Sequence, residues 1–204
     1  MGNMNVIELR NYLLKPGMRD GFNAYFTEHF VDSQNSRGGY VLEKFKVDGR
    51  EDKFFWVRGF EDMKTRSRFL PEFYGGPVWK EFGNGANEMM IDSDDVYLLK
   101  PLDDSRVFNP DKIVRVDYYF AKDRTPQKLI EIFRSRPEQD GTSLWTSELA
   151  ENDFPALPVF QYENLLVAIN PFSSDEGPSA PNPELLDQLG PFISKKESLT
   201  LYEI

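Results

Sequence analysis

Apolar and polar residues alternate in short runs along the first part of the chain. Residues 6–14 alternate at period two and end at Lys15-Pro16-Gly17, which predicts a strand followed by a turn. Residues 40–47 and 53–60 are two further runs of this kind, joined through Asp48-Gly49, a dipeptide favoured in tight hairpins. We therefore predict that these two strands pair antiparallel.

Helical spacing occurs in two stretches of the same half. Between residues 18 and 32, apolar residues recur every three or four positions, which predicts one amphipathic helix. A second apolar stripe runs through residues 61–87, but Pro71 and Gly75-Gly76-Pro77 interrupt it, so we predict a broken helix. Residues 96–99 form a last short strand. The order strand, helix, strand, strand, helix, strand is typical of a split ferredoxin-like unit.

The same order of elements begins again after an acidic segment bounded by prolines. The predicted strands of the second half are 113–120, 144–149, 161–169 and 198–204, and the predicted helices are 125–136, which is capped by Thr125, and 182–190. We divide the chain into a first ferredoxin-like half (1–102), a linker (103–111) and a second half (112–204). A ferredoxin-like sheet leaves one face bare, so the two antiparallel sheets are expected to pack face to face as a closed α+β barrel.

One alignment supports this tandem duplication. With an offset of 107 residues, Glu8-x-Arg10-x-Tyr12 falls on Arg115-x-Asp117-x-Tyr119, and the charges swap sign between the halves. We expect these residues to meet inside the barrel.

Composition narrows the classes of partner. The 34 acidic residues exceed the 24 basic residues, which gives a net charge of -10. This argues against nucleic acid and anionic membranes, because both attract proteins through cations. The apolar runs are too short to insert into a membrane, and no signal peptide begins the chain, so we predict a cytoplasmic protein. The absence of cysteine excludes disulfides, thiolate nucleophiles and cysteine-based metal sites.

A family resemblance is carried by Phe73-Tyr74-Gly75-Gly76-Pro77-Val78-Trp79-Lys80, together with residues 8–12, 56–60, 92–94 and 148–159. These stretches resemble bacterial members of the NIPSNAP family, within the dimeric alpha-beta barrel superfamily. The resemblance implies a pseudo-dimeric alpha-beta barrel. The wider superfamily includes cofactor-independent quinol monooxygenases, haem-degrading enzymes and muconolactone isomerases, but the resemblance carries no established catalytic set onto this chain.

Charged and aromatic residues gather on one predicted face of the first sheet. We place them on the side away from the helices, where they would orient an anionic or phenolic ligand in an aromatic-lined pocket. The alternative is a structural ion-pair network between the halves. The candidate pocket residues are Glu8, Arg10, Tyr12, His29, Trp56, Arg58, Trp79, Arg115, Asp117 and Tyr119.

His29 is the only histidine, and it falls on the predicted apolar helix face. It could serve as a general base or as an axial haem ligand. We favour the alternative of a core histidine that hydrogen bonds to a neighbour, because most buried polar groups are satisfied in this way. The sequence thus predicts no metal site and no tightly bound cofactor, with haem on His29 as the weaker option. Phosphate-loop, calcium-loop and hydrolase motifs are incomplete.

Two functions remain open from the sequence. The first is an enzyme that oxidises or isomerises a small aromatic or polyketide-like compound without a cofactor, in a lumen between the sheets, with Trp56, Tyr12, Arg58 and His29 around the substrate. The second is a non-catalytic binding or assembly module, in which an exposed patch near residues 74–79 docks a partner or a second copy of the chain.

Overall fold

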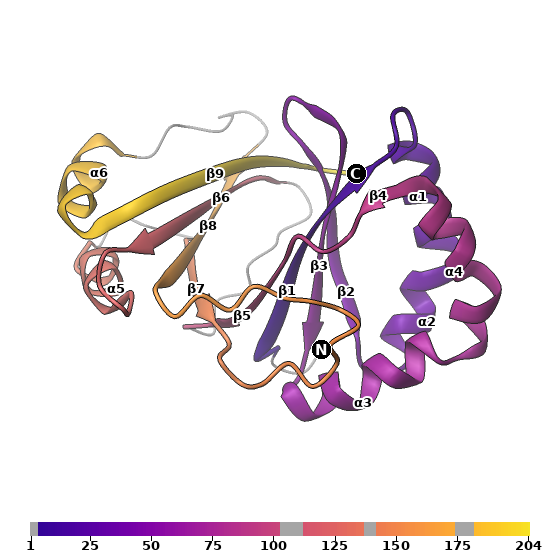
Figure 1. Ribbon diagram of the computed structural model, residues 1–204. Coiled ribbons are helices and arrows are strands. Elements are labelled where there is room, and N and C mark those ends of the chain that lie inside the picture. Colours follow the sequence, from indigo (N-terminus) through magenta and orange to yellow (C-terminus); the bar gives the residue numbers. More distant parts are fainter. Residues whose placement is uncertain (1–3, 103–111, 137–141, 174–181) are drawn as a thin grey trace.

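The computed structural model describes residues 4–102, 112–136, 142–173 and 182–204, and the predicted linker 103–111 lies outside them (Figure 1). The first half contains β1 (Val6–Leu14), α1 (Arg19–Phe26), α2 (Asp32–Asn35), β2 (Tyr40–Val47), β3 (Arg50–Phe60), α3 (Met63–Tyr74), α4 (Pro77–Met89), β4 (Met90–Asp92) and β5 (Val96–Pro101). The second half contains β6 (Lys112–Ala121), α5 (Gln127–Arg134), β7 (Ser143–Ser147), β8 (Leu165–Ser173), α6 (Pro183–Leu189) and β9 (Ile193–Glu203). Both halves follow the predicted ferredoxin-like order.

Eight of the strands close into one antiparallel barrel. The first sheet has the order β2-β3-β1-β5, and the second has the order β9-β6-β8-β7. Their edges are hydrogen bonded through β2 with β9 and β5 with β7. The short strand β4 pairs only with the end of β1. The predicted pseudo-dimeric alpha-beta barrel is therefore confirmed, with the two sheets joined at both edges.

Local sequence explains most element ends. The β2–β3 hairpin turns at Asp48-Gly49, where Gly49 has a φ of 65°, a conformation that glycine adopts without strain. The first helical stretch contains a π-helical turn, Thr27–Val31, between α1 and α2. Asn182 caps α6 as its side-chain oxygen accepts the Glu184 N–H at 2.9 Å. The predicted Thr125 cap is wrong, because Pro126 occupies the cap position of α5.

The predicted helix break is confirmed at Gly75-Gly76-Pro77 but not at Pro71. A Cβ at Gly75 would lie 2.7 Å from the Pro71 carbonyl oxygen, and Pro77 opens α4. Pro71 lies inside α3 on its exposed side. There the backbone carbonyl that loses its partner can bond to water, while the opposite side of the helix stays packed on the sheet.

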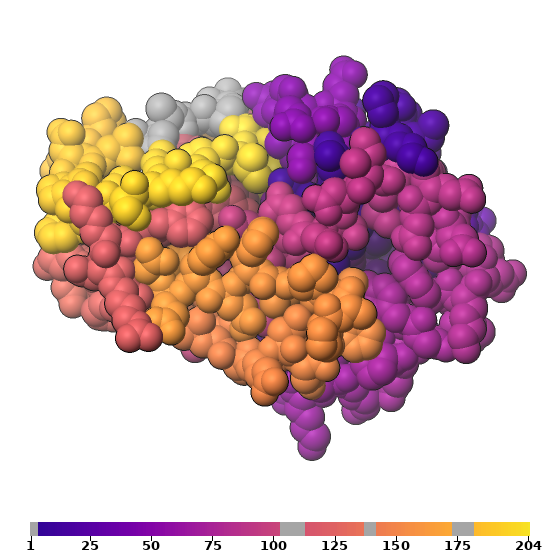
Figure 2. Space-filling view, viewed as in Figure 1, coloured from indigo at the N-terminus to yellow at the C-terminus, as the bar shows by residue number. Residues whose placement is uncertain are grey.

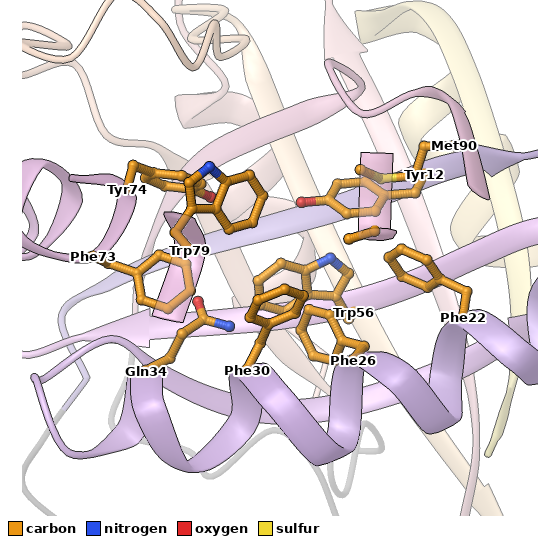
Figure 3. Close-up of a pocket in the computed structure, with 11 residues that line it drawn as sticks. Tyr12, Phe22, Phe26, Phe30, Gln34, Trp56, Phe73, Tyr74, Trp79 and Met90 are labelled. Atoms are coloured by element: carbon orange, nitrogen blue, oxygen red, sulfur yellow. The ribbon is translucent and has the colours of Figure 1, made fainter. Parts of the chain in front are cut away.

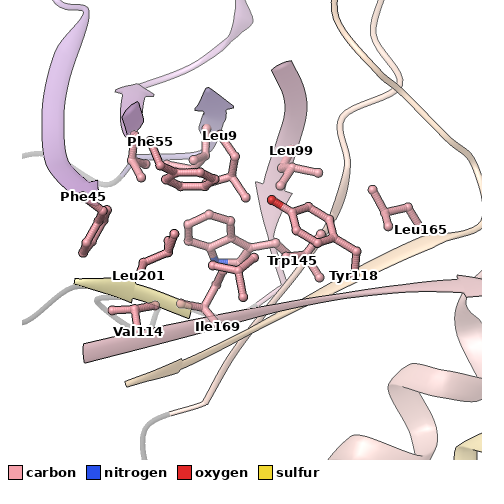
Figure 4. Close-up of a cluster of buried hydrophobic side chains, with 14 of the residues drawn as sticks. Leu9, Phe45, Phe55, Leu99, Val114, Tyr118, Trp145, Leu165, Ile169 and Leu201 are labelled. Carbon is pink, nitrogen blue, oxygen red and sulfur yellow. The ribbon is translucent and has the colours of Figure 1, made fainter. Parts of the chain in front are cut away.

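Apolar side chains fill the middle of the barrel (Figure 4). Trp145, which is fully buried, lies among Phe55, Leu9, Tyr118 and residues of every other barrel strand. A cavity of about 130 Å³ remains at one end. The packed middle leaves no room for a multi-ring compound, contrary to the open lumen that we predicted.

Helices cover the outer face of each sheet. In Figure 1, α1 to α4 lie against the first sheet, and α5 and α6 lie against the second. The connection between β7 and β8, orange in Figure 2, leaves the second half and lies on the helices of the first. Its Phe154 ring stacks on Tyr74 at 5.9 Å, and Ser67 donates a hydrogen bond to Asp153. Among the helices in the described ranges, none has the length and apolar character of a membrane span.

Candidate functional site

A buried ion cluster lies between the first sheet and α3. Glu8 in β1 contacts three guanidinium groups: Arg10 Nη1 at 2.8 Å, Arg58 Nη2 at 2.6 Å and Arg66 Nε at 2.8 Å. All four side chains are at most 1% exposed. With one carboxylate against three guanidiniums, the cluster carries a formal excess of two positive charges.

The register of the first sheet assembles this cluster. Glu8 lies opposite Arg58 in β3, and Arg10 follows Glu8 on the same face of β1. Arg66 comes from the apolar face of α3, where it lies in line with Phe69, Leu70 and Phe73. Burial alone would raise the pKa of the Glu8 carboxyl, but the guanidiniums, Arg58 foremost, outweigh it and hold that pKa far below its ordinary value.

The face on which these residues lie is the opposite of our prediction. Tyr12 and Trp56 pack in the outer cluster with Phe22, Phe26 and Phe69, so this face is turned toward the helices. The barrel interior receives Ile7 and Leu9 instead. The reason is that β1 is buried on both faces, so alternation marks two faces without showing which one meets the helices.

An aromatic pocket lies beside the ion cluster on the same face. Figure 3 shows Phe22, Phe26, Phe30 and Gln34 along the first helical stretch, facing Trp56 on the sheet. Its remaining walls come from the end of α3, from α4 and from β1 and β4: Tyr12, Phe73, Tyr74, Trp79, Ala86 and Met90. The open space is about 20 Å³, which is room for a water molecule.

Two polar side chains of the pocket accept a hydrogen bond from an arginine, and a third carries only a donor. Tyr12 Oη accepts a hydrogen bond from Arg10 Nε at 3.0 Å, so its own proton is free to point into the pocket. Gln34 Oε1 accepts from Arg58 Nη1 at 3.0 Å, which turns the amide nitrogen away from that guanidinium. Trp56 Nε1 is buried without a hydrogen-bond partner in the described part of the chain.

The pocket has no group suited to remove a proton. Its lining contains no Asp, Glu or His side chain within the described residues. Burial raises the pKa of the Tyr12 hydroxyl, which keeps it protonated near neutral pH. The walls can therefore stabilise an anion, but they cannot create one from a weakly acidic compound.

His29 lies outside this pocket. Its ring stacks on Phe82 of α4, with ring centroids 4.0 Å apart and an angle of 5° between the planes, and it also contacts Tyr25. Its side chain makes no hydrogen bond with the described residues, so the predicted hydrogen-bonded core histidine is wrong in that detail. The ring is held flat against Phe82 and lines neither the aromatic pocket nor the cavity at the end of the barrel.

The matching residues of the second half form a separate, smaller cluster. Asp117 contacts Arg115 Nε at 2.8 Å and Lys196 Nζ at 3.5 Å, and it accepts a hydrogen bond from Ser198 Oγ at 2.6 Å. Tyr119 packs toward α5 and α6. These residues lie on the outer face of the second sheet, so the prediction that they meet Glu8, Arg10 and Tyr12 inside the barrel is wrong.

Three polar residues of the ion cluster and the pocket were not among the predicted pocket residues: Gln34, Arg66 and Tyr74. Arg66 had a detectable signal, because it stands three and four residues before Phe69 and Leu70 on an apolar helix face. Gln34 and Tyr74 had none, since their roles depend on how α2 and α3 pack on the sheet.

Comparisons with solved structures identify the fold. A provisionally assigned monooxygenase from Lactobacillus acidophilus is 13% identical with a TM-score of 0.66, over 98% of this chain and 93% of that one. A second provisionally assigned monooxygenase, from Fusobacterium nucleatum, is 14% identical with a TM-score of 0.67, over 100% of this chain and 94% of that one. The chain has the alpha-beta barrel fold of these proteins.

NIPSNAP proteins are also among the similar structures. An uncharacterised NIPSNAP-like domain protein from Burkholderia xenovorans is 22% identical with a TM-score of 0.46, and covers 53% of this chain and 94% of its own. No family model and no curated protein matches the chain.

Proposed function

We propose that this protein binds a small aromatic or polyketide-like compound as its phenolate or enolate in the helix-side pocket, and promotes its oxidation without a bound cofactor. The observation that carries the proposal is the excess of two buried positive charges beside this pocket, where the Tyr12 hydroxyl accepts from Arg10 and Trp56 Nε1 has no partner among the described residues. Buried charge without a partner is costly, so an anion is the natural complement of this site.

Among the described residues that line the pocket there is no Asp, Glu or His, which favours one reaction over the other. Isomerisation needs a group that takes a proton from carbon and returns it elsewhere. Oxidation of a compound that ionises by itself does not need such a group. An enolate held by Tyr12 and Trp56 can react with O₂ and a solvent proton to form a C–O bond and a hydroperoxide. When the O–O bond breaks, the leaving hydroxide takes the remaining proton of that carbon, so that a CH₂ group becomes a carbonyl, one oxygen atom stays in the product and the other leaves as water. We therefore favour oxidation over isomerisation.

The pocket must widen to admit a ring. Tyr74 and Trp79 are partly buried and form its outer wall, with their rings 4.7 Å apart. Outward movement of these two side chains would join the 20 Å³ space to the solvent. This is also the stretch that we considered as a docking patch; in the structure Trp79 is partly buried and packs on Phe30 and Phe73.

A binding experiment with 4-nitrophenol tests the proposal, because its anion absorbs visible light. The bound compound is expected to remain anionic at pH values where the free compound is protonated. Arg10→Gln removes one guanidinium and leaves two against Glu8, so the variant should fold but bind the anion about tenfold more weakly. Arg115→Gln makes the same charge change on the other sheet and serves as the control. An equal loss of affinity in Arg10→Gln and Arg115→Gln contradicts the proposed site. So does a protein that binds 4-nitrophenol and its anion equally well.

Turnover separates the two candidate functions. Oxygen consumption can be followed with anthrone, a compound chosen because a solved structure described as an anthrone oxidase-like protein shares this fold at 9% identity. Uptake that disappears in Arg10→Gln supports an oxidase. If the protein binds the anion but consumes no oxygen with anthrone or with related phenols, the result supports a non-catalytic binding module.

A further inference from the structure

One end of the barrel contains a cavity of about 130 Å³ that is distinct from the helix-side pocket. Residues of β1, β6 and β9 and the beginning of β5 line it, and Leu9 and Tyr118 connect it to the barrel interior. An apolar cavity of roughly 150 Å³ accommodates benzene in a protein interior. We call it the mouth cavity; it has room for a small organic molecule.

Asn11 lines the mouth cavity and carries an acceptor that no described group satisfies. Its Nδ2 donates a hydrogen bond to Asp95 Oδ2 at 2.8 Å, and its backbone N–H donates to the Asp95 carbonyl at 2.9 Å. A carboxylate only accepts, so the amide orientation is fixed and Oδ1 points away from Asp95. This oxygen is buried and has no hydrogen-bond partner within the described ranges.

Tyr118 supplies a second unused polar group. The side chain is 4% exposed, and its hydroxyl makes no hydrogen bond with any described residue. Figure 4 shows this hydroxyl directed across the barrel toward Leu9 and Leu99. Burial raises the pKa of Tyr118 far above its ordinary value, so the group stays neutral and offers its lone pairs.

The two charged residues in the lining of the mouth cavity, Asp95 and Glu197, are both acidic, and no described lysine or arginine lines it. Lys53 lies outside the lining but interacts electrostatically with Asp95. Glu197 is paired with Lys195 at 2.6 Å on the exposed rim, so Asp95 is the carboxylate that faces the cavity without a cation in the lining. Tyr97 adds an aromatic ring 4.9 Å from that of Tyr118.

We propose that the mouth cavity binds a small primary ammonium ion. A primary ammonium group has three N–H donors and no acceptor, which matches the Asp95 carboxylate, Asn11 Oδ1 and the Tyr118 hydroxyl oxygen. The alkyl group lies against Leu9 and Leu199, and the ring of Tyr97 adds a cation–π contact. This site is independent of the arginine pocket and selects ligands of the opposite charge.

Three molecules of one shape test the charge preference: tert-butylammonium, tert-butanol and pivalate. Titration calorimetry at pH 7.5 should show saturable binding of tert-butylammonium in the millimolar range, at least tenfold weaker binding of tert-butanol, and none of pivalate. Equal binding of the cation and the alcohol, preference for pivalate, or no saturable binding of the cation overturns the proposal.

Variants assign the binding to this cavity. Asp95→Asn keeps the shape and removes the charge, and it should weaken tert-butylammonium binding at least tenfold. Tyr118→Phe removes only the hydroxyl and should weaken tert-butylammonium binding about threefold to tenfold. This variant still tests the site if Asp95→Asn folds poorly. Asp92→Asn changes an exposed carboxylate in β4 that does not line the cavity and should stay within twofold. Arg10→Gln should also leave ammonium binding unchanged. A loss in Asp92→Asn as large as in Asp95→Asn would show nonspecific attraction and refute the site.

Discussion

The two halves of the barrel follow the same path but treat their buried charges differently. In the first half, Glu8 is closed off with Arg10, Arg58 and Arg66, and all four side chains are at most 1% exposed. In the second half, the carboxylate of Asp117 is 1% exposed, but its partners Arg115 and Lys196 are 11% and 23% exposed. The corresponding positions therefore hold a fully buried cationic cluster in the first half and a partly solvent-exposed ion cluster in the second.

Helix cover explains this difference. The first sheet lies under α1 to α4 and under the connection from the second half, where Asn152 accepts a hydrogen bond from Arg66 Nη1 at 3.0 Å. The second sheet lies under α5 and α6, which have 8 and 7 residues. The two halves thus share one order of elements, and only the first, with its larger helical layer, closes its charged cluster off from solvent.

Removing the two carboxylates gives the sharpest test of this comparison. Glu8→Gln leaves three buried guanidiniums without their anion, and should lower the free energy of unfolding by about 3–5 kcal/mol. Asp117→Asn should cost only about 1–2 kcal/mol, because its cationic partners can turn to water and the remaining amide oxygen can still accept from one of the two donors, Ser198 Oγ or Asn170 Nδ2. Urea denaturation measures both. Similar losses in the two variants would show that the clusters are energetically alike.

The same pair has a predicted pH dependence. The pKa of Glu8 is lowered by folding, so its charge contributes stability that is fully present above the unfolded-state pKa of about 4.3 and is lost as pH falls toward the folded-state value. The stability difference between wild type and Glu8→Gln should therefore be constant from pH 8 to pH 5 and shrink below about pH 4. A difference that grows on acidification would contradict the lowered pKa.

Glycine substitutions compare how tightly the two halves are packed. A Cβ on Gly39 would lie 2.5 Å from the ring of Phe69, which is fully buried and cannot yield, so Gly39→Ala should cost about 1–3 kcal/mol. Gly190 has no atom within 4 Å of an added Cβ, so Gly190→Ala should change stability by less than about 0.5 kcal/mol. Thermal unfolding of both variants provides the measurement, and a neutral Gly39→Ala would refute the tight packing of α3 on the first sheet.

The sequence by itself determined the order of elements, the duplication and the fold class. Period-two runs, the Asp48-Gly49 turn and the Gly75-Gly76-Pro77 break are local signals, since turn geometry and alternation depend on neighbours in the chain. The residues of the candidate site were also largely visible, because charged side chains in otherwise apolar strands stand out. Glu8, Arg10 and Arg58 were found in this way.

Only the tertiary structure decided which way these residues face and what surrounds them. A strand buried on both sides has apolar residues on each face, so its pattern contains no information about which face meets the helices. Arg66 and Gln34 reach the cluster from helices. Asn11 of β1, Asp95 just before β5 and Tyr118 of β6 reach the mouth cavity from different halves. Contacts between residues far apart in the sequence depend on how the sheets close and how the helices pack. The sheets close where β2 pairs with β9 and β5 pairs with β7.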